Sequence, residues 1–276
     1  MGLRIYNNVE AQNAHRQLTN TNSQVTKAIE RLSSGLRINR AADDAAGLAV
    51  SEEMRTQIRG MAVASRNALD GISLAQVADG ALAGVGDMLQ RVRDLAVQAA
   101  NGTLTDQQRS NLDAEVQSVM NEIGRVASDT EFNGIKILSG SVATAASAVT
   151  LQVGANAGQV IGFTIATMSA SDLGISGIAV SSQASAAAAI ASIDSAIRIV
   201  TSTRAQMGAV QNRMEQTISR IDLTRENLQA AESRIRDADM AAEMIQFTKN
   251  QILQQSGTAM LAQANQAPQS VLQLLQ

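Results

Sequence analysis

Few residues in this 276-residue chain could carry out acid–base, nucleophilic or metal chemistry. The sequence has no Cys and no Trp, and His15 is its single histidine. Because Cys is absent, thiol catalysis, disulfides and Cys-based zinc sites are excluded. His15 lies on an amphipathic segment without a companion ligand, so we interpret it as a packing or assembly residue.

Two further patterns resemble parts of active sites. Asp43 and Asp44 form a carboxylate pair, as in general acid–base catalysis, but the small residues around them favour helix capping, a turn or contacts to basic residues. Gly80, Gly84 and Gly86 resemble a phosphate-binding loop, yet no strand precedes them and no Lys-Ser or Lys-Thr follows. The sequence therefore predicts no catalytic, cofactor-binding or metal-binding residues, and we do not expect an enzyme.

The net charge of −3 conceals a local excess of positive charge in residues 1–40. Six basic residues stand there against Glu10 and Glu30, namely Arg4, Arg16, Lys27, Arg31, Arg37 and Arg40. A basic arm for nucleic acid or anionic lipid is one interpretation, but the charges are spaced among apolar positions. A solvated helix face or an assembly surface is favoured, and we expect no nucleic-acid partner.

Membrane-spanning runs and N-terminal secretion signals each have a recognisable sequence pattern. We find no run of about 18 apolar residues, so we expect no membrane insertion. The opening segment MGLRIYNNVEAQ has no basic stretch followed by an apolar run, so we expect no cleavable secretory signal.

The strongest structural signal is an apolar position that recurs every seven residues in the C-terminal half. The series is Ile193, Val200, Met207, Met214, Ile221, Leu228 and Ile235. A second series, four residues after the first, is mixed: Ile197, Arg204, Gln211, Ile218 and Arg225. This repeat predicts a helix over 184–235, about 75 Å long at 1.5 Å per residue, whose seam packs against other long helices.

The N-terminal half contains matching helical patterns. Apolar residues step by three and four residues within 25–36 and within 112–126. Thr105 and Gln108 form a capping-box pattern that begins the second helix, and Asn101-Gly102 ends the helical stretch before it. Because 45% of the residues are apolar and only 1% aromatic, we expect closely packed helices without a deep ligand pocket.

The middle of the chain has a different character. No Lys or Arg occurs from 137 to 197, and two β-branched runs flank residues 154–158, which predicts a hairpin. FNGIKIL, from Phe132, adds another turn with a short apolar extension. We therefore expect a mainly α fold in which long, coiled-coil-like helices from both termini pack together, with a small β-hairpin region in the middle.

The apolar residues near the two ends have little in the chain to cover them. The set includes Leu3, Ile5, Val9, Leu18, Val25, Val271, Leu272 and Leu275. Pairing one arm with the other leaves much of this surface wet, so we expect full burial only against neighbouring copies, in a helical polymer. Pro268 suits the first turn of a final short helix.

Five segments with a characteristic sequence are spread over nearly the whole chain. They are IERLSSGLRINRAADDAAGLAVSEEMRTQIRG from Ile29, LQRVRDLAVQAANGT from Leu89, FNGIKIL from Phe132, LQVGANAGQ from Leu151 and SRIRDADMAAEM from Ser233. Together with their spacing, these segments resemble bacterial flagellins. The resemblance implies a short flagellin without large outer domains. Its divisions would be an inner-core arm over 1–40, outer-tube helices over 41–140, a low-charge hairpin segment over 141–183, an outer-tube helix over 184–235 and an inner-core arm over 236–276.

The resemblance also implies function and partners. It suggests a self-assembling structural subunit of an extracellular filament for swimming, exported through the flagellar type III apparatus. The partners would be copies of itself, an export chaperone, and the cap and hook–filament junction proteins. A vertebrate flagellin-sensing Toll-like receptor would contact Gln90, Arg91, Leu95 and Glu115, although Asp94 replaces the Glu often found beside Leu95.

Two alternatives were weighed against the filament subunit. A helical enzyme would need a clustered site, which the sequence does not show. A hook-associated junction protein shares terminal heptads, but we would not expect it to carry LQRVRDLAVQ and LQVGANAGQ together.

Overall fold

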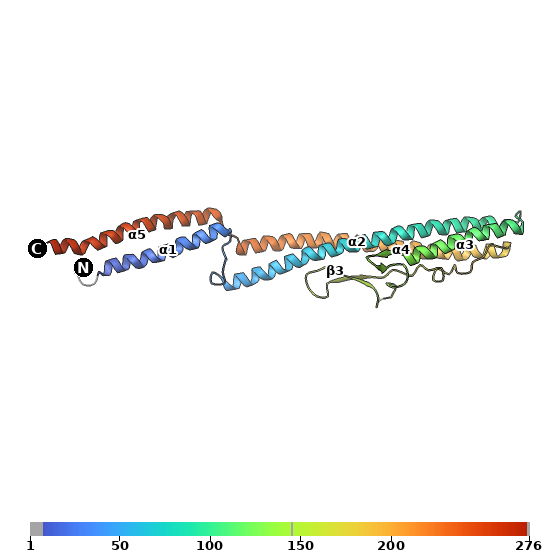
Figure 1. Ribbon diagram of the computed structural model, residues 1–276, viewed down its shortest axis with the longest axis horizontal. Coiled ribbons are helices and arrows are strands. Elements are labelled where there is room, and N and C mark those ends of the chain that lie inside the picture. Colours follow the sequence, from blue (N-terminus) through green and yellow to red (C-terminus); the bar gives the residue numbers. More distant parts are fainter. Residues whose placement is uncertain (1–7, 145, 275–276) are drawn as a thin grey trace. The chain divides into compact units, whose positions relative to one another are not determined.

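The computed structural model describes residues 8–144 and 146–274, with side chains described up to residue 266. The long helices are α1 (Val9–Ser34), α2 (Ala45–Ala99), α3 (Asp106–Asp129), α4 (Gln183–Arg236) and α5 (Met240–Leu274), and they confirm the mainly α prediction (Figure 1). The chain divides into two compact units. We call Gln57–Glu226 the central unit, and the described residues up to Thr56 and from Asn227 onward the terminal unit.

An antiparallel seam between α2 and α4 forms the core of the central unit. Buried positions on α4 alternate by three and four residues, and these are Ala186, Ala189, Ile193, Ala196, Val200, Thr203, Met207, Val210, Met214, Thr217 and Ile221. Arg93 bonds Asp194 at 2.7 Å and Arg204 bonds Asp79 at 2.9 Å, so ion pairs flank the seam. This is heptad packing, and the helix expected over 184–235 extends one residue further at each end.

The second track of this seam differs from the expected one. It lies three residues after the first, at Ala196, Thr203, Val210 and Thr217, and not four residues after it. Arg204 lies outside the seam and pairs with Asp79 on α2. Because the second track consists mostly of small side chains, α2 can approach α4 closely.

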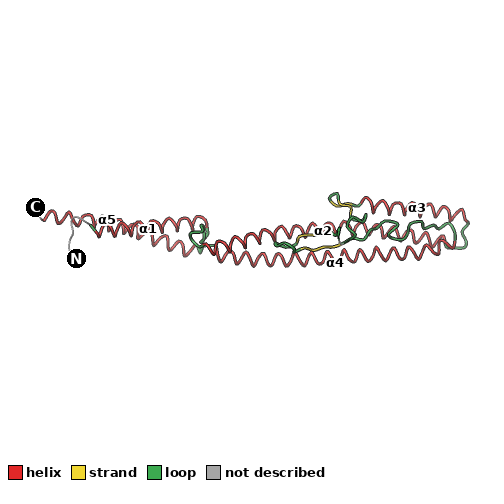
Figure 2. The backbone as a smooth tube through the Cα atoms, turned by 90° about the horizontal axis from the view of Figure 1, so that it is seen from below, coloured by secondary structure: helices red, strands yellow, loops and turns green. Residues whose placement is uncertain are grey.

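Helix α3 lies alongside α2 and α4 in both views (Figures 1 and 2). It begins with the predicted capping box: Gln108 N donates to the Thr105 hydroxyl, and Thr105 N donates to Gln108 Oε1. Its apolar face, with Val116, Met120 and Ile123, joins the common core.

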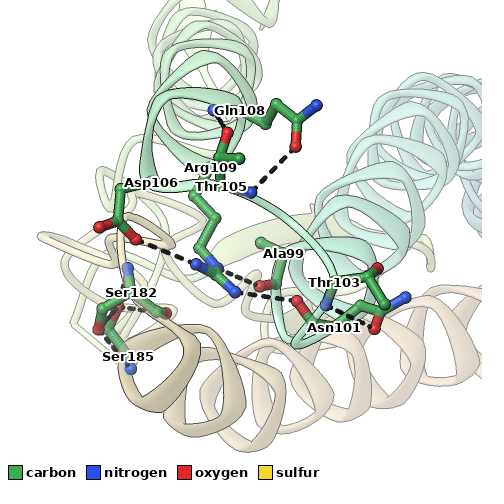
Figure 3. A network of polar contacts seen from close by, with 9 residues as sticks. All are labelled: Ala99, Asn101, Thr103, Thr105, Asp106, Gln108, Arg109, Ser182 and Ser185. Atoms are coloured by element: carbon green, nitrogen blue, oxygen red, sulfur yellow. Dashed lines mark hydrogen bonds and ion pairs between the residues drawn. The ribbon is translucent and has the colours of Figure 1, made fainter.

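A buried arginine ties the end of α2 to the start of α3 (Figure 3). Arg109 is 7% exposed, and its guanidinium donates to the carbonyls of Ala99 and Asn101, each at 3.0 Å, and to Asp106 Oδ1 at 3.1 Å. The last carbonyls of a helix have no intrahelical donor, so Arg109 supplies a donor to the Ala99 carbonyl at the end of α2. The Asn101 carbonyl also accepts from Leu104 N at 3.4 Å. The sequence patterns did not identify Arg109.

The middle segment forms two short antiparallel hairpins. β1 (Glu131–Phe132) pairs with β2 (Ile135–Lys136) through a turn in which Asn133 and Gly134 both have positive φ, of 50° and 78°. β3 (Val149–Gln152) pairs with β4 (Val160–Phe163), with Val149 opposite Phe163, as predicted from the residues around 154–158.

The irregular parts of the middle segment are fastened to α3 and to one another. Val180 N donates to Asp113 Oδ1 at 2.6 Å, and Gln117 Nε2 donates to the Ile178 carbonyl at 2.7 Å. Apolar side chains from this segment, including Leu138 and Ile165, are fully buried in the common core. The middle segment, which lacks Lys and Arg from residue 137 onward, therefore packs against the helices of the central unit and contributes to its core.

In the terminal unit, α1 and α5 run antiparallel and side by side (Figures 1 and 2). Arg31 lies 3.7 Å from Glu243, Gln254 Nε2 donates to Asn22 Oδ1 at 3.1 Å, and Asn8 Nδ2 donates to the Ala264 carbonyl at 2.8 Å. The expectation of a separate final helix beginning at Pro268 is wrong, because α5 continues without a break through that residue to Leu274.

Hydrogen bonds between residues 35–52 and 236–238 join the helices of the terminal unit at a corner. Gly35 ends α1 in the left-handed conformation (φ 71°), and its carbonyl accepts from Ala238 N at 2.9 Å. Arg37 N donates to the Arg236 carbonyl at 2.7 Å, and the Arg236 side chain bonds Glu52 at 2.5 Å. Residues that lie about 200 positions apart in sequence are thus held together.

The carboxylate pair belongs to this corner, as the capping and turn interpretation expected. Asp44 Oδ1 accepts from Gly47 N at 2.9 Å at the start of α2. Asp43 Oδ2 accepts from the backbone N–H groups of Arg40 and Asn39, and these bonds, that to Arg40 most strongly, lower the pKa of Asp43. Both carboxylates therefore stabilise the turn before α2 by accepting hydrogen bonds from backbone N–H groups.

Among the described residues, α4 alone has the length and the apolar composition of a membrane-crossing helix, with a mean hydropathy of 1.3 over an 18-residue window. The expectation that nothing in the chain is apolar enough was therefore too strict. Helix α4 also carries Asp194 in an ion pair, and its Ile193 and Val200 are buried in the core of the central unit. One side of α4 therefore packs inside the central unit.

Candidate assembly surface

The contact between α1 and α5 is a narrow heptad seam. On α1 the positions from 11 to 28 that are not exposed are Ala11, Ala14, Leu18, Thr21, Val25 and Ala28. On α5 the corresponding positions from 241 to 266 are Glu243, Phe247, Asn250, Gln254, Gly257, Leu261 and Ala264. Both sets alternate by three and four residues, which defines one stripe along each helix.

The residues in this seam are mostly small or polar, whereas large apolar residues of the same helices are exposed. Those exposed are Val9, Ile29, Met240, Met244, Ile245, Ile252, Leu253 and Met260. Ile245 is 69% exposed and Ile252 63%. We call the exposed apolar residues of α5 the outward face. Burial of apolar surface stabilises by about 25 cal/mol per Å², so these exposed side chains contribute little hydrophobic stabilisation to the terminal unit by itself.

The structure places the predicted terminal residues in different environments. Val9 is exposed, whereas Val25 is buried and Leu18 half-buried in the α1–α5 seam. Leu18 lies close to α5, with its Cδ1 3.3 Å from the position of a Cβ built on Gly257. Val271 and Leu272 belong to α5, but their side chains lie outside the described residues, as do Leu3, Ile5 and Leu275 altogether.

The seven residues of the long heptad series also divide into two groups. Ile193, Val200, Met207, Met214 and Ile221 are buried in the central unit. Leu228 and Ile235, which belong to the terminal unit, are half-buried.

The residues expected at a receptor surface do not all lie on the surface. Gln90 and Arg91 are exposed, and Arg91 bonds Glu115 across α2 and α3 at 2.5 Å. Leu95 is only 2% exposed and packs in the core. The expectation that Leu95 offers an apolar contact to a partner is therefore wrong for this structure, because α2 turns that side chain inward.

An open groove of about 490 Å³ lies beside Arg91 and Glu115. Met88 and Val119 supply its apolar lining, and Asp87, Ser118 and Glu122 complete it. The pKa of Glu122 is lowered, chiefly by a hydrogen bond from Arg125. Arg91, Glu115 and Glu122 at this groove are thus held in ion pairs on the surface of α2 and α3.

Ion pairs shift the pKa values of several charged side chains. The pKa of Glu52 is lowered chiefly by its hydrogen bond from Arg236, and those of Arg93 and Arg204 are raised chiefly by hydrogen bonds to Asp194 and Asp79. Among the described residues, no three His, Cys, Asp or Glu side chains gather as metal ligands would. Several of the ion pairs connect different helices, among them Arg93–Asp194 and Arg204–Asp79.

Long helical seams, an exposed apolar helix face and charges used for helix pairing define a structural protein that associates with copies of itself. Residues 5–143 match the bacterial flagellin N-terminal helical region, and residues 190–275 match the bacterial flagellin C-terminal helical region. The chain belongs to the bacterial flagellin family. It is a structural subunit of the extracellular flagellar filament that serves swimming motility, and not an enzyme.

Two flagellar proteins are similar to this chain in sequence over nearly their full length. A flagellin of Halalkalibacterium halodurans is 51% identical over 273 residues, which cover 98% of this chain and 99% of that protein. The flagellar filament 33 kDa core protein of Treponema phagedenis is 50% identical over 283 residues, with 98% and 99% covered. The crystal structure of Bacillus cereus flagellin is 29% identical, has a TM-score of 0.50 and covers 56% of this chain and 88% of that one.

Proposed function

We propose that the subunit assembles through its terminal helices, with the outward face of α5 buried against neighbouring copies. One observation carries this proposal: the α1–α5 seam consists largely of small and polar residues while Ile245, Ile252 and Leu253 are exposed. A soluble two-helix unit would be expected to place its large apolar residues between its helices. An exposed apolar face of this kind is typical of an association surface.

The divisions inferred from the sequence fit this arrangement. Residues 1–40 and 236–276 would be the inner-core arms of the filament. Residues 41–140 and 184–235 would form the outer-tube helices, and the hairpin segment over 141–183 would cover them. In this scheme the central unit is the folded body of each subunit, and the arms complete their burial only in the polymer.

Export and partners follow from the same proposal. The chain would pass unfolded through the flagellar type III apparatus without a cleaved signal. An export chaperone, the cap and the hook–filament junction proteins would then be its partners besides copies of itself.

The assembly proposal is tested by shortening α5. Removal of Gln266–Gln276 should leave a soluble, helical monomer with its central unit intact, but one unable to grow filaments in the electron microscope. Normal filaments from the truncated chain would show that the ends are not the main assembly determinant. Loss of the central unit as well, seen by circular dichroism, would show that the ends fold together with it.

A matched pair of substitutions tests the outward face itself. Ile252→Asn should raise the critical concentration for polymerisation at least tenfold, because it places an amide in the buried contact. Gln255→Asn, at an exposed α5 position close by, should leave that concentration unchanged. Equal behaviour of the two variants would remove this face from the assembly contact.

We also propose that a vertebrate flagellin-sensing receptor contacts Gln90, Arg91 and Glu115. The exposed Arg91–Glu115 pair and the adjacent groove support this surface, which would exclude the buried Leu95. Arg91→Ala should weaken activation of the receptor by the monomer, since arginine is often a hot spot of protein interfaces. Unchanged activation by Arg91→Ala would contradict the proposal.

A further inference from the structure

The α1–α5 seam contains a buried amide that forms no hydrogen bond. Asn250 is 1% exposed, and neither Nδ2 nor Oδ1 has a hydrogen-bond partner among the described residues. Asn250 is one of the seam positions of α5 and the least exposed of them. Its surroundings therefore exclude water without replacing the bonds that water would make.

The opposing helix explains why the amide has no partner. Contacts of Arg31 with Glu243 and of Asn22 with Gln254 set the antiparallel register, which places Asn250 opposite the region of Val25. Val25 has no polar side-chain atom. The hydroxyl of nearby Thr21 donates its one proton to the Gln17 carbonyl at 3.0 Å, so it has no donor left for Asn250 Oδ1, and it makes no hydrogen bond with Asn250.

An unpaired polar group in a contact opposes formation of that contact, because the amide loses its bonds to water when the helices close. Opening the pair restores those bonds. A buried Asn in a heptad seam is known in general to lower the stability of helix pairing. The consequence in this chain is that α1 and α5 pair weakly when the subunit is alone.

We propose that Asn250 is a brake on spontaneous assembly. By keeping the α1–α5 pair from closing in a single chain, it prevents the outward face of α5 from presenting an ordered apolar surface to other free subunits. The pair closes when a growing filament supplies the burial that offsets the cost. This inference rests on the proposed assembly through α5.

The test replaces Asn250 in the full-length chain and compares it with its neighbour. Asn250→Leu removes the amide at similar volume, and Gln251→Leu makes the same kind of change at an exposed position. In the free monomer, Asn250→Leu should slow hydrogen exchange of the α1 amides over residues 14–28 roughly tenfold or more. It should also shorten the lag of unseeded polymerisation several-fold, whereas Gln251→Leu should do neither.

Each other outcome overturns the brake. Unchanged α1 exchange in Asn250→Leu would show that the amide does not weaken the pair. Slower exchange with an unchanged lag would show that pairing does not limit assembly, and an equal shortening by Gln251→Leu would assign the effect to added hydrophobicity. Asn250→Ala removes the amide without adding bulk, and it should also slow exchange of the α1 amides and shorten the lag. If Asn250→Leu only aggregates, Asn250→Ala decides: unchanged α1 exchange in that variant overturns the inference. Exchange in the monomer is independent of assembly, so a failure of the wild-type chain to polymerise would count against the proposed function alone.

Discussion

Replacing Met214 by Asp tests the seam between α2 and α4 at a position with no exposed surface. Met214 is fully buried, on the track that also holds Met207 and Ile221. Losing a buried Met side chain costs about 2–5 kcal/mol, and an unpaired carboxylate in its place adds a desolvation cost. We expect a total of at least about 4 kcal/mol, a large part of the roughly 5–15 kcal/mol that holds a domain folded. For a unit of this size the thermal midpoint should fall by about 10 °C or more.

Circular dichroism at 222 nm during heating of the monomer measures this change. Met214→Leu, which keeps volume and apolarity, should cost less than about 1.5 kcal/mol. Asn212→Asp, at an exposed position of the same helix, should stay within about 0.5 kcal/mol of the wild type. The proposed seam register would be refuted if Met214→Asp melted within a few degrees of Asn212→Asp.

Further predictions concern glycine packing, the buried arginine and acid sensitivity. A Cβ on Gly71 would lie 2.8 Å from Met214 Sδ and still closer to Leu151, whereas one on Gly84 meets nothing within 4 Å. Urea unfolding should therefore show Gly71→Ala to be less stable than Gly84→Ala by about 1–3 kcal/mol, since both gain the same helix propensity. Arg109→Ala removes the side-chain donor to the Ala99 carbonyl and one of two donors to the Asn101 carbonyl, and it should cost about 1–3 kcal/mol. Arg109→Lys should restore only part of this stability, and equal urea midpoints for wild type and Arg109→Ala would contradict the role. Because the folded-state pKa of Glu52 is lowered by Arg236, the stabilisation from this pair should be present above the ordinary Glu pKa and be lost as pH falls through the lowered value. An NMR titration should show the Glu52 midpoint rising in Arg236→Gln, and an unchanged midpoint would argue against the pair.

Large apolar residues at regular spacing were enough to predict the main elements. The series through Ile193 and Val200 located α4, and Thr105 with Gln108 located the start of α3. The second seam track was missed because Ala196 and Thr203 are small, so that a search for large apolar residues favoured Ile197 and Ile218 instead. Small residues in a seam carry little hydropathy signal although they set the distance between helices.

The receptor-facing residues and the terminal seam depend on tertiary packing, which periodicity does not specify. Leu95 precedes Ala96 on α2, and both belong to the core that residues of α3 and the middle segment complete. The burial of Leu95 therefore depends on tertiary packing. The seam side of α5 includes Glu243, Asn250 and Gln254, which are polar, so apolar patterning could not locate this contact face. The assembly and receptor residues stay predictions.

The two seams share one heptad geometry but differ in the residues that occupy it, and this difference separates folding from assembly. In the central unit, Ile193, Met207 and Met214 fill the contact, and α3 and the middle segment cover it, so its burial is complete within one chain. The α1–α5 contact has Ala14, Thr21 and Asn250 at equivalent positions, and isolated helix pairs of this kind gain little from closing. Ordering the two arms costs roughly 1–2 kcal/mol per residue in backbone entropy, which a seam of small and polar side chains does not offset. The large residues that could offset this cost, such as Ile245 and Ile252, are exposed in the single chain. Under the proposed assembly, their burial stabilises the arms when another subunit lies against them, so the body would fold alone and the arms would gain full order at the end of a growing filament.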